Sequence, residues 1–213
     1  MSTLELTQLE GLDWGSWRQL ATQHPDGPGP DAPDVESLDD RSRLLTLRRL
    51  LATVADSGTT VQLAIETKHP TRYGGLVERQ LVSVLHEFGW AAPPPGGTGR
   101  VRMMSFSVLA LRRMRQLAPR LPLVLLMDRL PLAYRDGDLP RGVGIAGPGL
   151  HVLRQHPDFV RRLRERGNAV HVWTVDHPAD VQLCLDAGVQ AIITNRPASV
   201  IEQLDRPAAT GLA

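Results

Sequence analysis

The sequence predicts an α/β fold that forms most of a (β/α)8 TIM barrel. From residue 61 onward, short apolar runs alternate with helical stretches, which is typical of parallel strands joined by crossover helices. The 213 residues, with 42% hydrophobic and 22% charged side chains, have the composition of an ordinary globular chain of one large or two small domains. An open doubly wound sheet is the alternative to a barrel, and the faces of the first strand decide between them.

Ahead of this alternating region the chain has a different pattern. Leucines at helical spacing in residues 1–17 predict a short helix capped by Trp14 and Trp17. Several prolines and glycines in residues 22–40 predict a surface loop. A stripe of apolar side chains in residues 44–55 predicts a second helix that packs on one face.

The alternating region itself contains six predicted strands and five predicted helices. We expect strands over residues 61–68, 101–106, 123–127, 143–147, 170–176 and 190–195. We expect helices over residues 76–88, 108–117, 157–166 and 178–187, and a last helix from residue 198. The intervening segments 91–99 and 128–141 are rich in Pro and Gly and are predicted to be loops.

Alternation along the first strand gives it one apolar and one polar face. The apolar face holds Val61, Leu63, Ile65 and Thr67, and the polar face holds Gln62, Ala64, Glu66 and Lys68. In a barrel, the apolar face lies under the helices while the polar residues point toward the interior and the carboxyl-end mouth. An open sheet covered on both faces would bury the charged residues beneath a helix, which is costly unless they are paired. The pattern therefore favours the barrel.

Composition excludes several classes of function. A formal net charge of +1 provides no electrostatic footprint for nucleic acid or an anionic membrane surface. Cys184 is the single cysteine, which excludes an internal disulfide framework and a cysteine-based zinc site. The longest apolar run, residues 121–127, is far shorter than the roughly 20 residues of a transmembrane helix. The first residues lack a secretory signal, so we expect a cytoplasmic location, although this sequence does not show whether a signal peptide lies upstream of Met1.

Three places in the sequence can carry chemistry. Glu66 and Lys68 lie two residues apart at a strand end, where a carboxylate can hold a hard cation and an ammonium can meet a phosphate; the alternative is an ion pair within the strand. Alternation places Trp173 on one face with His171, near a strand end, where it can wall a pocket or fill the core. At the junction of Ser105 and Phe106 with the next helix, a hydroxyl can contact substrate or cap the helix.

Other features are better explained by structure. The arginines of residues 112–120 and 161–166 lie on predicted outer helices and indicate solvated faces. The glycines of residues 142–149 lack the preceding strand and following helix of a dinucleotide fingerprint. The histidines show no metal-ligand spacing, and Cys184 is predicted to be a small core residue.

Four segments occur in the order and at the spacing of a known family. Residues 64–70, 102–107, 170–176 and 188–197 together resemble the glycerophosphodiester phosphodiesterase family, especially its actinobacterial-type members. The resemblance covers residues 1–204, which we expect to form one domain of this family without its amino-terminal part. Residues 205–213 are expected to be a C-terminal tail.

The resemblance implies a (β/α)8 barrel that uses a divalent cation, Mg or Ca, to hydrolyse glycerophosphodiesters to an alcohol and glycerol 3-phosphate. By this likeness Glu66 matches a metal ligand and Lys68 a phosphate-facing lysine. Trp173 matches the aromatic residue on the glycerol side of the pocket, and Ser105 and Phe106 match a substrate-binding pair at the mouth.

The sequence also departs from the family pattern. Family members carry a His-Arg-Gly strand, a Glu-x-Asp strand and a His-Asp turn, none of which occurs here, so about two βα elements of the barrel are missing. No catalytic histidine is therefore assigned in this chain, the cation site is incomplete, and we expect the chain as given to be inactive and to associate with itself through open barrel edges. The alternatives are a non-catalytic binding or scaffold paralogue that keeps the phosphate pocket, and a related barrel phospholipase acting on lipid phosphodiesters.

Overall fold

The protein is represented by a computed structural model that describes residues 5–14, 44–69, 74–95, 97 and 99–205. Contacts within the chain divide it into two compact units, residues 1–59 and 60–213. The predicted loop at residues 22–40 and the tail from residue 206 lie outside the described residues, as does Trp17. The prediction of one domain over residues 1–204 stays a prediction.

The first unit contains both helices that the sequence predicts for it. Helix α1 spans Leu6–Glu10 and stops at Gly11, and helix α3 spans Leu47–Asp56. The indole N–H of Trp14 donates a 2.7 Å hydrogen bond to the carbonyl oxygen of Leu9. Because this carbonyl belongs to the last turn of α1, Trp14 caps the helix as predicted.

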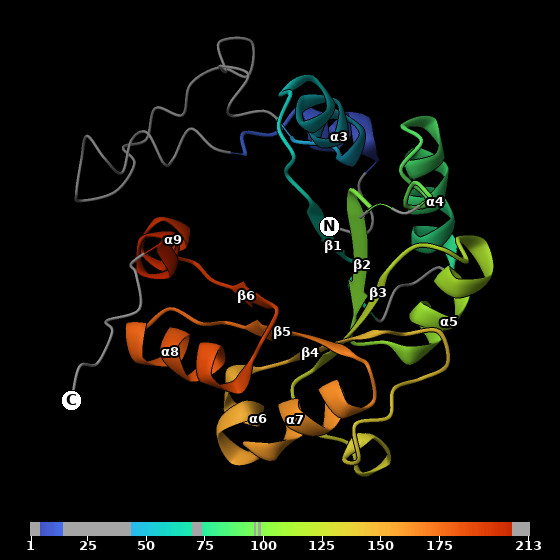
Figure 1. Cartoon of the computed structure of the whole chain (residues 1–213). Helices are drawn as coiled ribbons and strands as arrows, with labels where there is room; N and C mark the ends of the chain where they lie inside the picture. Colours follow the sequence, from blue (N-terminus) through green and yellow to red (C-terminus); the bar gives the residue numbers. More distant parts are fainter. Residues whose placement is uncertain (1–4, 15–43, 70–73, 96, 98, 206–213) are drawn as a thin grey trace. The chain divides into compact units, whose positions relative to one another are not determined.

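The second unit is built on a sheet of six parallel strands in the order β1-β2-β3-β4-β5-β6 (Figure 1). The strands are β1 Leu63–Glu66, β2 Val101–Ser105, β3 Leu123–Met127, β4 Ile145–Pro148, β5 Ala169–Trp173 and β6 Ala191–Ile193. All six predicted strands are confirmed, most of them shorter than predicted. Because all six strands are parallel, their carboxyl ends meet along one rim of the sheet.

Helices follow the strands as crossover connections on the outside of the curved sheet (Figure 1). They are α4 Leu76–Glu87, α5 Val108–Leu117, α6 Leu150–Gln155, α7 Asp158–Glu165, α8 Pro178–Ala187 and α9 Pro197–Asp205, with a 3-10 turn at Leu132–Tyr134.

Helix α6 was not predicted from the sequence. It begins directly after the glycine run, with Gly149 as its N-cap, and part of the run forms strand β4. As a run, the described glycines therefore do not follow a strand and open a helix, as a dinucleotide fingerprint requires, and that expectation is confirmed.

The two faces of the sheet differ as the barrel interpretation requires. On the outer face, Met103, Leu123 and Val172 are at most 1% exposed beneath the helices. On the inner face, Met104, Val124 and Leu126 form an apolar cluster against which Ile145, Trp173 and Ile193 pack. The helices thus cover one face of the sheet, and the other is the inner wall of a half-barrel. This is the arrangement of a barrel and not of a doubly wound sheet.

Candidate functional site

A cleft of about 340 Å³ opens on the inner face at the carboxyl ends of the strands. Its lining comes from β1, β2, β3, β5 and β6 or the residues just beyond them: Glu66, Lys68, Met104, Phe106, Leu126, Trp173, Thr174 and Ile193. Four of the five site residues predicted from the sequence, Glu66, Lys68, Phe106 and Trp173, therefore come together in one place. We call the part formed by Glu66 and Lys68 the charged wall, and the part formed by Phe106 and Trp173 the aromatic wall.

The charged wall is a close ion pair at the end of β1. The ammonium of Lys68 donates to Oε2 of Glu66 at 2.8 Å, and the Lys68 side chain is 82% exposed while that of Glu66 is 22% exposed. An ion pair this exposed contributes only about 0–1 kcal/mol to stability. The pairing predicted as the structural alternative is present, yet the exposed ammonium keeps hydrogen-bond donors free for an anion.

Lys68 is also the single lysine of the chain: the sequence has 24 Lys and Arg, so the remaining 23 are arginines. An ammonium is a compact charge with three rotatable donors, whereas a guanidinium is a planar fork, so the two are not interchangeable at a binding site. A chain that otherwise uses only arginine thus places its one lysine in the cleft.

The aromatic wall is formed by Trp173 with Phe106 against its ring. The two ring centroids lie 5.5 Å apart at an interplanar angle of 85°, which is the edge-to-face geometry that aromatic pairs prefer. The indole N–H of Trp173 donates to the carbonyl oxygen of Gly147 at 2.7 Å. This donor is therefore occupied, and the ring offers the cleft an apolar surface.

Two glycines at the end of β4 lie in close contact with neighbouring side chains. A Cβ atom at Gly147 would lie 2.8 Å from the Leu126 side chain, and one at Gly149, directly after β4, would lie 2.6 Å from the His151 side chain. The glycine run that resembled a phosphate cradle therefore allows close packing at the end of this strand.

Ser105 is the one predicted site residue that does not line the cleft. It is 0% exposed, and its hydroxyl donates to the Thr67 carbonyl oxygen at 3.2 Å and accepts from the Ser107 N–H at 3.1 Å. The hydroxyl that caps the next helix belongs to Ser107, which accepts from the N–H of Ala110. Ser105 thus fastens the end of β1 to the turn after β2 from behind the sheet.

A polar group lies on the inner face near the cleft without lining it. His171 is 5% exposed, and its Nε2 lies 3.4 Å from Nη1 of Arg102, whose other terminal nitrogen donates to Oε1 of Gln62. Burial, together with the charge of Arg102, lowers the pKa of His171 to about 4. His171 is therefore neutral near pH 7, and it is not among the residues that line the cleft.

Some polar residues of the rim were missed by the sequence interpretation. Asp176, just beyond β5, accepts hydrogen bonds from the backbone N–H of Asn195 at 2.8 Å, from the Asn195 side chain at 2.9 Å and from the Thr194 hydroxyl at 3.0 Å. The bonds from Asn195, backbone first, hold the pKa of Asp176 below its usual range. Both ends of this network lie in segments that carry the family resemblance, which is the only sequence signal for it.

The features that the sequence analysis set aside behave differently from one another. Arg161 is exposed and pairs with Asp158 and Glu165 on its own helix, as expected of a solvated face. Cys184 is buried as predicted, and burial raises the pKa of its thiol to about 11. Arg113, assigned to a solvated face, instead reaches a buried carboxylate, so that expectation was wrong for this residue.

The described residues do not form a complete metal centre. Among them, no group of three or more His, Cys, Asp or Glu side chains is placed to hold a metal ion. Glu66 brings a carboxylate to the described lining of the cleft, whereas Mg or Ca usually collects about six or more oxygen ligands, some of them from water.

Comparison with known proteins gives one consistent result. Residues 1–199 match the model of the glycerophosphoryl diester phosphodiesterase family. A Mycobacterium tuberculosis protein named "Probable glycerophosphodiester phosphodiesterase 1" is 37% identical over 211 residues, which are 99% of this chain and 73% of the relative. A Bacillus subtilis glycerophosphodiester phosphodiesterase is 32% identical over 201 residues, and there the match spans only 61% of the relative.

Solved structures agree on the fold. An Oleispira antarctica phosphodiesterase, solved with the product sn-glycerol-3-phosphate, has a TM-score of 0.70 at 19% identity and aligns with 96% of this chain and 72% of its own. A Parabacteroides distasonis glycerophosphodiester phosphodiesterase has a TM-score of 0.63 at 24% identity and aligns with 78% of this chain and 66% of its own.

Proposed function

The chain belongs to the glycerophosphoryl diester phosphodiesterase family, and on that premise we propose that its cleft binds the phosphate and glycerol groups of a glycerophosphodiester. The observation that carries the proposal is the convergence of Glu66, Lys68 and Trp173 on one cleft at the carboxyl ends of the strands. Barrel enzymes keep their chemistry at this end. The proposed reaction of the family site is hydrolysis to an alcohol and glycerol 3-phosphate.

The two walls of the cleft suit the two parts of such a ligand. The exposed ammonium of Lys68 can donate hydrogen bonds to the phosphate oxygens and offset the negative charge that grows on them in the transition state. The ring of Trp173, with its N–H already bonded, offers the carbon skeleton of glycerol an apolar surface. Phe106, which is 46% exposed, extends that surface to the mouth.

The family is typically metal-dependent, and Glu66 supports a cation at the proposed phosphate position. A carboxylate beside a phosphodiester is repulsive unless a positive charge lies between them. Lys68 supplies one such charge at 2.8 Å, and a divalent Mg or Ca ion would supply a larger one. Because the described residues leave its ligand set incomplete, we assign Glu66 as a ligand and derive no catalytic step through the ion.

We further propose that the 213-residue chain alone binds without efficient hydrolysis. Its described cleft lining contains no histidine, and positioned general acid–base groups typically contribute about 10² to 10⁴ in rate. This also keeps the binding or scaffold paralogue as the second candidate function, since both walls of the binding cleft are present. A phospholipase acting on lipid phosphodiesters is the third.

Release of glycerol 3-phosphate tests these proposals. We would assay the chain, and a version extended at its amino terminus with the family's His-Arg-Gly, Glu-x-Asp and His-Asp elements, on glycerophosphocholine with and without a chelator. We expect background release from the chain and chelator-sensitive release from the extended version. Equal rates would contradict the proposed inactivity, and an inactive, folded extended version would favour the scaffold candidate. Preference for an intact phospholipid would favour the phospholipase.

Self-association through sheet edges remains a proposal with a definite location. Strands β1 and β6 end the sheet of described strands, and beyond β6 lies an apolar groove of about 400 Å³ between α8 and α9. Unpaired edges beside apolar surface favour association with a second copy. Sedimentation velocity on the wild-type chain and on Ile201→Glu, which places a charge in this groove, tests the proposed self-association. A wild-type chain that stays monomeric at all concentrations would contradict it.

Of the described helices, none has the length and apolarity to cross a membrane. The cytoplasmic location stays a prediction.

A further inference from the structure

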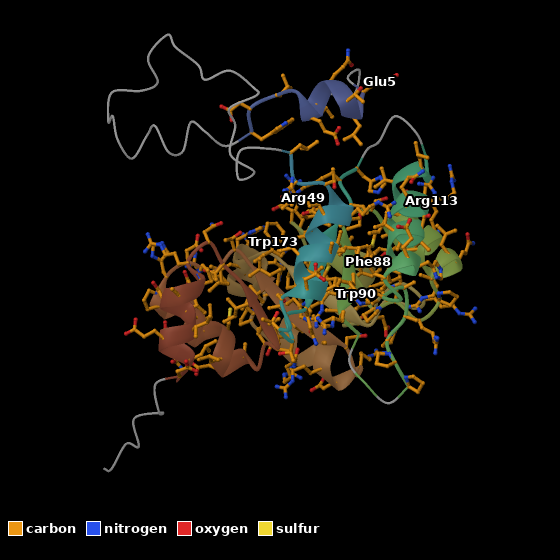
Figure 2. All side chains as sticks on the ribbon, turned by 90° about the horizontal axis from the view of Figure 1, so that it is seen from above. Glu5, Arg49, Phe88, Trp90, Arg113 and Trp173 are labelled. Atoms are coloured by element: carbon orange, nitrogen blue, oxygen red, sulfur yellow. The ribbon has the colours of Figure 1, made fainter. Side chains whose placement is uncertain are left out.

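Behind the charged wall, on the outer side of the sheet, lies a buried carboxylate. Glu78 on α4 is 0% exposed, and its Oε1 lies 3.5 Å from Nε2 of His69 and 3.4 Å from Nη1 of Arg113 on α5. Figure 2 shows Arg113 well apart from Trp173, which lines the cleft. These three residues, which we call the rear cluster, therefore lie outside the proposed binding site.

The rear cluster is poorly explained by stability. Oε2 of Glu78 and Nε2 of His69 are buried, and neither has a hydrogen-bond partner among the described residues. Buried polar and charged groups with incomplete hydrogen bonding are costly, and apolar replacement of a buried ion pair, such as Glu78 with Arg113, is often neutral or stabilising. We therefore looked for a contribution of this cluster other than stability.

The position of His69 indicates what that contribution is. His69 directly follows Lys68, and its side chain is only 13% exposed. Glu66 and Lys68 line the cleft, whereas the intervening Thr67 is buried. Alternate side chains at this strand end therefore point forward into the cleft and back toward the helices, so a hold on the rear side chains sets the direction of the front ones.

The backbone between them is fixed as well. The N–H of Thr67 donates to the Met104 carbonyl oxygen at 3.0 Å, and the Thr67 carbonyl accepts from Ser105. These bonds hold β1 up to residue 67. Beyond that residue, the described contacts of this segment include the Lys68–Glu66 ion pair in front and the contact of His69 with Glu78 behind.

We propose that Glu78 is a positioning residue for the cleft. Its Oε1 contacts the His69 ring from behind at 3.5 Å, Arg113 balances its charge, and Glu78 thereby keeps the Lys68 ammonium against Glu66 at the mouth. Glu78 touches no substrate and acts through His69. The inference rests on the proposed function for the meaning of the cleft and adds the device that keeps its charged wall in place.

The single lysine makes the arrangement directly observable. Reductive methylation with carbon-13 formaldehyde labels one side-chain amine in the whole chain, Lys68, besides the α-amine, so its dimethyl signal in an NMR spectrum reports one environment. The Glu66→Gln variant supplies the signal position of a Lys68 without its partner. The measurement needs neither ligand nor turnover.

Three variants then test the role of Glu78. We expect Glu78→Gln to move the Lys68 signal toward the Glu66→Gln position. We expect the double variant Glu78→Met with Arg113→Met to show the same shift of the Lys68 signal. Its thermal midpoint should equal that of the wild type or be higher, and a purely structural role does not produce this combination. The matched control, Glu165→Gln, removes an exposed carboxylate that pairs with Arg161 at 2.9 Å and should leave the signal unmoved.

A wild-type signal position in folded Glu78→Gln would overturn the proposal. If Glu78→Gln unfolds, the double variant provides the test, and a wild-type position of the Lys68 signal in it would also overturn the proposal. Adding glycerol 3-phosphate to the wild type separates the two ideas: a signal that does not respond counts against the proposed function, whereas the positioning result, read without ligand, still holds.

Discussion

The two walls of the cleft are held in different ways. The charged wall sits on one short strand and is fastened from behind by polar groups, with Ser105 bonded to Thr67 and Glu78 beside His69. The aromatic wall is supported by the backbone carbonyl of Gly147, which accepts from the Trp173 indole, and by the edge-to-face contact of Phe106 with the Trp173 ring. The charged wall thus depends on buried polar contacts behind the strand, whereas the aromatic wall depends on one backbone acceptor and a contact between two rings.

The largest expected effects are kinetic: the charged wall should influence kcat and the aromatic wall KM. In the extended version, Glu66→Gln should reduce glycerol 3-phosphate release to background by weakening the cation site, and Lys68→Ala should lower kcat about 10²-fold through the phosphate. Trp173→Ala should instead raise KM, about 10-fold, with kcat nearly unchanged, because its apolar contact is made equally in the ground and transition states. Steady-state kinetics at varied glycerophosphocholine concentration measure both constants.

Glu165→Gln is the control for these variants, because its carboxylate lies on an exposed helix face. Should Trp173→Ala lower kcat as far as Glu66→Gln does, the division of labour between the walls would be wrong.

The next effect concerns the stability of the inner face. Because the pKa of His171 is lowered from 6.5 to about 4 in the folded state, the unfolded chain binds one more proton between these pH values. Above pH 6.5, His171 does not change the free energy of unfolding with pH. As pH falls from 6.5 toward 4, the free energy of unfolding should decrease by about 3 kcal/mol because of this residue. Urea unfolding at several pH values measures it. In a His171→Gln variant, the unfolding free energy should fall less between pH 6.5 and pH 4. If it falls as steeply as in the wild type, the lowered pKa of His171 would be contradicted.

The smallest effect is confined to the aromatic wall. The edge-to-face contact between Phe106 and Trp173 should contribute about 0.5–1.5 kcal/mol beyond burial. A double-mutant cycle with Phe106→Leu and Trp173→Leu, followed by urea unfolding, isolates that coupling. A coupling energy near zero would mean that the two rings form the wall independently.

Local alternation was enough to predict much of the molecule. It placed Glu66 and Lys68 on one face, and the family resemblance added the roles of Phe106 and Trp173, all of which line the cleft. The same rule could have corrected Ser105, because adjacent strand residues point to opposite faces and Phe106 already faced the mouth.

Contacts between distant elements were beyond this reasoning. Nothing in the sequence near Glu78 shows that α4 faces both His69 and Arg113, and Arg113 in an arginine-rich segment looked solvated. Helix α6 was missed because Pro157 marked a plausible helix start and the preceding six-residue helix is too short for a clear periodic pattern.

Protection of Lys68 from an amine-reactive acylating agent tests most directly whether the cleft binds a phosphate ester. Peptide mass spectrometry follows Lys68, the single side-chain amine, with the chain's α-amine as internal reference. We predict that glycerol 3-phosphate slows acylation of Lys68 relative to the α-amine, that inorganic phosphate does so less, and that glycerol does not. Equal rates with saturating glycerol 3-phosphate and with glycerol would contradict a phosphate-ester site at Lys68.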